Sequence, residues 1–540
     1  MAPLRCYFGN GKPAGESFTI IVRLRVERVR SPRVSKGTLG SSALPDGRAS
    51  DTVHRIVTIL SMMNSTETNL ATVEREVQSR SASLKKELGL FDLVLIQVVF
   101  VFGTVWVGFA ATLGRSQMAF WLIAIVTFYL PLAAVVIYLN RLAPLEGGLY
   151  QWAKVAFGDF LAFLVAWNFW IFGILVMSGI GLIIKKNIAY AIGPRANWMH
   201  ENKWMTTLVC VVLITSVVAA SRRGLALGKW VQNFGGAMLI ITVATLILMP
   251  FITASRGSLA NYHPFLFSLR EIKFNSHNLN VCSKLAVGAL SGFEYIAILA
   301  GECRAPSRNI SRSVWISAPI IALMFILGTA SVLAFVTPDK VDLIAPIPQV
   351  LSLAFGSFGW VSLLISLTIF GVAARQIALM SIYFAGNTRL PMVAGWDNLL
   401  PVWFAKLHQK YRTPVNSILF VGATTLVFSL APLIGVKEAE AFQFQDNAAS
   451  ILYALIYMVL FAIPIIAMKR FGATAPLWLK AAAILGFLMS VTGAFFTVFP
   501  IIDVESRWLF AAKIIAVVLI ANAIGATIYA LDKKRARVAA

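Results

Sequence analysis

Glycine breaks in two of the chain's long apolar runs constrain this sequence more than any other feature. Twelve such runs lie between about residues 90 and 531, and the first and sixth are interrupted at residues 103–108 and 288–294. Backbone that unwinds at membrane depth is tolerated only where protein or a water-filled cavity satisfies its N–H and C=O groups. Glycine-interrupted segments at matching places in two repeats are typical of the binding site of a secondary transporter.

The length of the runs predicts the fold class. A span needs about 20 apolar residues to cross a hydrocarbon core of roughly 30 Å. The sequence therefore predicts an all-α integral membrane protein with about twelve transmembrane helices, of which helices 1 and 6 are discontinuous. The first five spans and the next five are expected to form two inverted repeats, followed by two further spans. The predicted spans are 91–113, 119–139, 159–184, 205–220, 231–253, 284–300, 314–336, 357–386, 415–435, 448–468, 480–501 and 510–531.

Composition and charge agree with a membrane protein. Hydrophobic residues make up 58% of the chain and charged residues 13%, against about 45–50% and about 25% in soluble domains. The net charge of +23 is by itself compatible with a nucleic-acid partner, but Lys and Arg concentrate in alternate loops, for example at Lys85, Arg222, Arg304 and Lys406. This positive-inside pattern indicates contact with anionic lipid rather than nucleic acid. We expect a multi-pass protein of the cell (inner) membrane with both termini in the cytoplasm.

The chain divides into a polar lead and one membrane domain. Residues 1–85 are basic and rich in Ser, Thr and Arg, without an apolar run suited to a signal peptide. They are predicted to be a disordered cytoplasmic extension, or an upstream extension of a chain whose true start is Met62 or Met63. Residues 86–535 form the transporter domain, and 536–540 end the cytoplasmic tail. The scattered cysteines and histidines lack metal-ligand spacing, so no metal site and no cofactor are predicted.

Several motifs occur in an order that resembles one family. The stretch 144–158 begins Pro-Leu-Glu-Gly-Gly, the sixth span ends in the stretch 300–312, and the loop after the eighth span contains 387–391 and 397–416. Over about residues 88–535 this series resembles the amino acid–polyamine–organocation superfamily. The resemblance implies a five-plus-five inverted repeat and a central site between discontinuous first and sixth helices. It also implies amino acids, polyamines or related amines as substrates.

The two breaks supply the candidate binding site. A half-helix N-terminus offers free N–H groups and a partial positive charge to a carboxylate, and unwound carbonyls suit an ammonium group. The alternative is that the glycines only allow close helix packing. Bulky Trp106 departs from the small-residue run common in the first helix, so it either shrinks the pocket or stacks on a substrate. The residues expected to bind substrate are Gly103, Thr104, Val105, Trp106, Val107, Gly108, Ser291, Gly292, Phe293 and Glu294.

Glu294 and Arg375 are the ionisable residues deepest in the predicted spans and are the coupling candidates. An ionisable group at mid-bilayer costs about 2.5–3.5 kcal/mol, so it usually faces a cavity or a partner. Glu294 is a candidate proton carrier or amine partner, and otherwise a structural hydrogen-bonding group. Arg375 keeps its charge and is expected to serve as a fixed cation where related transporters bind sodium, to pair with Glu294 or a substrate carboxylate, or to snorkel to an interface. Trp167 is a further pocket candidate, with ordinary packing as its alternative.

Together these features predict a secondary active transporter of amino acids or related amines that works by alternating access. Proton coupling or exchange is favoured over sodium, because a fixed Arg375 and a titratable Glu294 suit it better. The alternatives are a channel or a non-transporting membrane sensor of the same fold. The chain is not expected to be an enzyme, since no Ser/His/Asp or His-metal cluster lies in the predicted spans. The expected partners are the bilayer and a small molecule, and the sequence assigns no oligomeric state.

Overall fold

The computed structural model describes one compact unit of this chain in detail. The chain divides into Met1–Leu60 and Ser61–Ala540, and all the described residues belong to the second unit. They are 70–81, 84, 86–199, 202–223, 225–256, 268, 271–355, 359–396, 400–430, 438–502, 504 and 506–539. The possible start at Met62 or Met63 lies outside these residues, as does most of the predicted extension. Its last part forms helix α2 (Leu70–Ser81), which buries Val73 and Val77.

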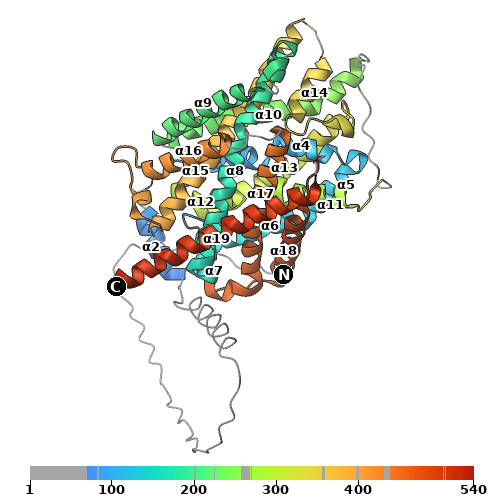
Figure 1. Cartoon of the computed structure of the whole chain (residues 1–540). Helices are drawn as coiled ribbons and strands as arrows, with labels where there is room; N and C mark the ends of the chain where they lie inside the picture. Colours follow the sequence, from blue (N-terminus) through green and yellow to red (C-terminus); the bar gives the residue numbers. More distant parts are fainter. Residues whose placement is uncertain are drawn as a thin grey trace, which may run out of the picture. The chain divides into compact units, whose positions relative to one another are not determined.

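The described part of the membrane domain is helical (Figure 1). Within it, nine helices are long and apolar enough to cross a membrane. One is the continuous stretch Gly114–Leu142, which contains α5 (Gln117–Ala124) and α6 (Leu130–Leu142). The others are α8 (Asp159–Ile192), α9 (Lys203–Arg222), α10 (Leu225–Arg256), α13 (Pro306–Leu333), α15 (Gly359–Trp396), α17 (Glu438–Ala462), α18 (Leu477–Thr497) and α19 (Arg507–Ala539).

The first predicted span is broken at the start of the predicted interruption, residues 103–108, but Thr104–Gly108 already belong to a helix. Helix α3 (Leu90–Val101) and helix α4 (Thr104–Ala111) meet at an angle of 42°. Phe102 and Gly103, between them, have extended backbone. The last carbonyls of α3 and the first N–H groups of α4 therefore lie at the break without the partners that a continuous helix would supply.

The sixth predicted span is also broken. Helix α11 (Ser276–Lys284) runs into a π-helical turn, Leu285–Ala289, and helix α12 (Tyr295–Ile298) follows after an unwound stretch. Gly292 in this stretch has φ +117°, and a Cβ there would lie 2.4 Å from Cδ1 of Phe100. Only glycine combines that backbone conformation with so close an approach to the first span.

The remaining helices are shorter. Helix α16 (Val415–Leu430) lies in the predicted span 415–435, while α7 (Leu149–Phe157) and α14 (Pro346–Phe355) lie in loops between predicted spans. Helix α15 packs against both α8 and α10, and α17 packs against α8 and α18 (Figure 1). The count of twelve spans and the inverted repeat stay predictions.

The two ends of the helix bundle are marked by polar contacts. At one end, which we call the Lys86 end, the backbone of Leu88 exchanges hydrogen bonds with Glu302 and Arg304. At the other, the Asp342 end, the Asp342 carboxylate accepts a 2.9 Å hydrogen bond from Tyr190 and lies 3.5 Å from Lys186. Along the middle of the outer helices, large apolar side chains are exposed, among them Val212, Leu323, Leu488 and Leu519. Such a surface is what the predicted bilayer contact requires.

Candidate functional site

A cavity lies between the breaks of the first and sixth spans. Its lining includes Gly103, Thr104, Val105 and Trp106 from the first break, and Gly288 and Ser291 from the sixth. Helix α3 adds Phe100 and Val101, helices α8, α15 and α17 supply the rest of the wall, and the cavity volume is about 90 Å³. The structure thus brings the two predicted half-sites to one space.

Trp106 bridges the two breaks. A Cβ on Gly103 would lie 2.4 Å from Cδ1 of the indole, and a Cβ on Gly288 would lie 2.4 Å from its Cη2. The ring therefore packs on two glycines, one in each break, while it also lines the cavity. Of the two roles expected for Trp106, this position favours the one in which it narrows the pocket.

Arg375 on α15 caps the first half-helix. Its Nη2 donates hydrogen bonds to the carbonyl oxygens of Val99, at 2.8 Å, and Phe102. Its Nη1 donates to Oε1 of Gln376 at 2.9 Å. The last carbonyls of a helix have no helical donor and carry a partial negative charge. A buried guanidinium supplies them with both hydrogen-bond donors and a positive charge. With a side chain only 1% exposed, Arg375 does not snorkel to an interface.

Glu294 is buried behind the cavity wall. Its Oε1 accepts hydrogen bonds from the hydroxyls of Tyr453 and Tyr457 on α17, the latter at 3.0 Å. Its Oε2 has no hydrogen-bond partner among the described residues. No ion pair joins Glu294 to Arg375 in the part of the chain that the structure describes. The two coupling candidates are therefore held separately, each by its own partners.

The other predicted residues do not line the cavity. Gly108 lies against α14, where a Cβ would be 3.1 Å from Cγ of Pro346, and the Phe293 ring stacks on Tyr129. The indole N–H of Trp167 donates a 2.7 Å hydrogen bond to the Ala521 carbonyl on α19. Trp167 lines a separate apolar cavity. Val107, Gly292 and Glu294 are likewise outside the lining of the central cavity.

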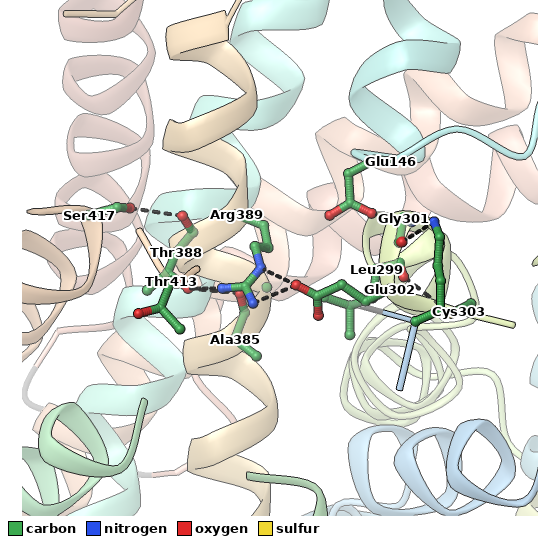
Figure 2. Close-up of polar contacts among 12 residues, drawn as sticks. Glu146, Leu299, Gly301, Glu302, Cys303, Ala385, Thr388, Arg389, Thr413 and Ser417 are labelled. Atoms are coloured by element: carbon green, nitrogen blue, oxygen red, sulfur yellow. Dashed lines mark hydrogen bonds and ion pairs between the residues drawn. The ribbon is translucent and has the colours of Figure 1, made fainter. Parts of the chain in front are cut away.

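A buried polar cluster closes the Lys86 end, and Figure 2 shows it in close-up. Arg389 donates two hydrogen bonds to Oε1 of Glu302, from Nε at 2.9 Å and from Nη2 at 2.6 Å. Gly301 N–H donates to Oε2 of Glu146, and the Lys86 ammonium donates to the Gly301 carbonyl. These contacts join the loop before α7, the end of the sixth span and the end of α15.

Sequence reasoning did not assign a role to this cluster. Glu146, Glu302 and Arg389 each belong to one of the three motifs that carry the family resemblance. The signal that could have predicted the cluster is the presence of opposite charges beside glycines in separate motifs. Gly148 shows why the glycine pair is needed, since φ is +35° and a Cβ would lie 2.6 Å from the Ala297 carbonyl carbon. Burial, reinforced by the charge of Glu302, raises the pKa of Glu146 above its usual range.

Comparison with known proteins agrees with this architecture. A family model described as amino acid permease matches residues 88–520. The chain belongs to the amino acid permease family. The predicted resemblance to the amino acid–polyamine–organocation superfamily is thereby confirmed. Membership also establishes a multi-pass membrane protein of a transporter family.

Individual relatives are distant but cover most of the domain. An uncharacterized transporter of Legionella pneumophila is 25% identical over 387 residues, which cover 70% of this chain and 80% of that protein. A probable agmatine/putrescine antiporter of Lactococcus lactis is 22% identical, covering 70% and 78%. A branched-chain amino acid permease of Bacillus subtilis is 23% identical, covering 66% and 77%.

Among solved structures, MhsT in complex with L-phenylalanine has the same fold. Its TM-score is 0.58 at 12% sequence identity, and the match covers 76% of this chain and 98% of that one. Identity this low relates the two folds alone. The family assignment therefore rests on the sequence match, and the solved structure supports the overall helical fold.

Proposed function

We propose that the chain is a secondary active transporter of amino acids or related amines that works by alternating access in the cell (inner) membrane, with both termini cytoplasmic. The observation that carries the proposal is the cavity between the two broken spans, lined by Gly103–Trp106 and by Gly288 and Ser291. A substrate bound there touches both breaks, so a movement of either half of the bundle changes its surroundings.

The cavity suits a small zwitterion or amine. The N–H groups of Thr104 and Val105 precede the first backbone hydrogen bond of α4, from Trp106 N–H to the Gly103 carbonyl, so they can bind a substrate carboxylate. The carbonyls at the end of the π-helical turn Leu285–Ala289 can accept from an ammonium group. Ser291, whose hydroxyl donates to the Gly288 carbonyl at 2.9 Å, adds a polar side chain to the same wall.

The two ends of the bundle differ in a way that supports alternating access. The Glu302–Arg389 pair and the Glu146–Gly301 hydrogen bond close the Lys86 end. Phe442, Gln445 and other residues near the start of α17 line the cavity toward the Asp342 end. We interpret this arrangement as a carrier closed on its cytoplasmic side.

The position of Arg375 favours coupling that does not use sodium. Its guanidinium donates to the first-span carbonyls of Val99 and Phe102, which a dissolved cation would otherwise be free to bind, and arginine does not lose its charge in proteins. We therefore propose transport that does not require sodium, with Glu294 as the group that carries a proton or supports exchange. Replacement of sodium by N-methylglucamine should leave the uptake rate unchanged.

Reconstitution of the full chain into proteoliposomes tests the proposed function. Uptake of radiolabelled amino acids and amines should saturate with concentration and should accelerate when the vesicles are preloaded with unlabelled substrate. Flux without saturation or counterflow would favour the channel. Binding without flux would favour the sensor, and a chemically altered substrate after uptake would favour an enzyme.

A further inference from the structure

A carboxylate on the wall of the central cavity receives no hydrogen bond. Asp446 on α17 lines the cavity, and its side chain is 15% exposed. No described residue donates a hydrogen bond to it, and its Oδ2 is buried without such a partner. A desolvated carboxylate that lacks donors is costly. The exposed part of the carboxylate therefore includes Oδ1, which is the acceptor that a ligand in the cavity can reach.

The nearest cation does not satisfy Asp446. Lys284, at the end of α11, has its Nζ 4.0 Å from Oδ2 of Asp446. The same ammonium donates a short hydrogen bond to Oδ1 of Asn447 and lies 5.3 Å from the centre of the Phe109 ring. Lys284 is fully buried and does not line the cavity. It therefore offsets part of the charge from behind the wall and leaves the cavity face of Asp446 open.

The other charged group of the wall is already engaged. Among the described residues that line the cavity, Asp446 is the one carboxylate and Arg375 the one cation. The Arg375 guanidinium is turned to the carbonyls of Val99 and Phe102. The Arg375 Nε is buried without a partner, so Asp446 is the charged group of the wall that still offers exposed hydrogen-bonding capacity to a ligand.

Aromatic rings complete the surroundings of this carboxylate. Trp106, Phe172, Tyr383 and Phe442 line the same cavity. The faces of aromatic rings attract ammonium and guanidinium groups, most strongly where water is excluded. A carboxylate set among aromatic rings is a combination that recognises an organic cation.

We propose that Asp446 determines the substrate selectivity of this transporter, by binding a cationic side chain or second amino group as an ammonium or guanidinium ion. The inference rests on the proposed function. There the two helix breaks bind the carboxylate and the first ammonium group of the substrate, and here Asp446 binds its side chain or second amino group. When such a cation binds, it donates to the Asp446 carboxylate the short hydrogen bonds that Lys284 does not donate. Substrates that carry this second charge are preferred over neutral amino acids of similar size.

The test compares L-lysine, agmatine and L-leucine as probes in proteoliposomes that contain the full chain. The wild type should transport L-lysine or agmatine with a higher kcat/KM than L-leucine. Asp446→Asn should raise the KM for the cationic probes about tenfold or more, because the charge-assisted hydrogen bond is lost. The KM for L-leucine should change little.

Two further variants make the comparison specific. Glu440→Gln removes a negative charge from the same helix at a position that does not line the cavity, and it should leave the selectivity unchanged. Asp446→Glu keeps the charge and should restore part of the preference for L-lysine and agmatine. Thermal stabilisation of each purified variant by the three probes gives a second measure of binding that does not depend on flux.

The outcomes separate this inference from the proposed function. A wild type that transports L-leucine but neither cationic probe overturns the role of Asp446 and leaves the transporter standing. An Asp446→Asn protein with wild-type selectivity overturns it as well. If none of the three probes is transported or stabilises the wild type, both proposals fail.

Discussion

The contact between Trp106 and Gly288 offers the sharpest test of the site's geometry. A Cβ on Gly288 would lie 2.4, 2.7 and 3.1 Å from Cη2, Cζ2 and Cζ3 of the indole. Carbon atoms pack best at about 3.5–4.0 Å, so in Gly288→Ala the ring must move by about 1 Å or more. Overpacking of this kind costs about 1–3 kcal/mol. We expect Gly288→Ala to lower both the thermal stability and the uptake rate.

The same geometry predicts a rescue. Trp106→Leu shortens the side chain and frees the space that the new methyl group needs, so the double variant should be more stable than the sum of the two single changes predicts. The coupling energy of residues in contact is about 0.5–3 kcal/mol, whereas independent sites add within about 0.3–0.5 kcal/mol. Unfolding of the purified variants in detergent measures the coupling, and uptake in proteoliposomes measures its effect on transport.

Additive effects of the two substitutions would refute this reasoning, because they would mean that the indole does not lie on Gly288. Gly103→Ala provides an independent check from the other break, since its Cβ would lie 2.4 Å from Cδ1 of the same ring. Trp106→Leu should relieve that variant too. Gly525→Ala is a matched control, since its Cβ would crowd Trp167, at 2.5 Å from Cδ1, and not Trp106. Trp106→Leu should not rescue it.

Three further predictions concern the buried carboxylates. Glu302→Gln leaves the charge of Arg389 buried without its partner, so it should destabilise the closed Lys86 end by about 3–5 kcal/mol, measured as a loss of thermal stability. The raised pKa of Glu146 means that the folded chain holds this proton more tightly than the unfolded one. The free energy of unfolding should therefore decrease as the pH rises from the usual pKa of a glutamate to the raised pKa of Glu146. In Glu146→Gln the free energy of unfolding, measured at a series of pH values, should decrease less steeply over this range. Glu294→Gln keeps an acceptor for Tyr453 and Tyr457 but does not titrate. It should fold and lose most of the pH dependence of uptake, and an unchanged pH profile would exclude Glu294 from coupling.

The breaks could be predicted from the sequence because they depend on local chemistry. Glycines interrupt two apolar runs, and backbone freedom at a position such as Gly292 follows from the residue itself. Ser291 and residues 103–106 therefore lie at the cavity as expected. Trp167 shows the limit of this reasoning. It lies on a 34-residue helix, α8, whose rotation is set by packing against several neighbours, so the sequence alone does not indicate which cavity it faces.

Partners far apart in the chain could not be predicted for a related reason. Glu294 and Tyr453 are 159 residues apart, and Glu146 and Gly301 are 155 apart. Neither pair has a spacing that a local pattern can encode, because each depends on how the helices pack. The partners of Arg375 also depend on helix packing. Pairing with Glu294 was one of its expected roles, but its guanidinium donates hydrogen bonds to the first span and to Gln376.

The position of Arg375 ties the break of the first span to the chemistry of coupling. Unwinding a span at membrane depth exposes carbonyls that need a cation or a donor. The Arg375 guanidinium supplies both the positive charge and the donors to the carbonyls of Val99 and Phe102. These carbonyls therefore do not need an ion from solution. A cation that cannot dissociate cannot carry the energy of a gradient across the membrane. In the proposed function, coupling therefore passes through a group whose charge can change, for which we propose Glu294. It lies at the sixth break and accepts hydrogen bonds from two hydroxyl groups of α17, so a change of its charge would alter the contact between that break and α17.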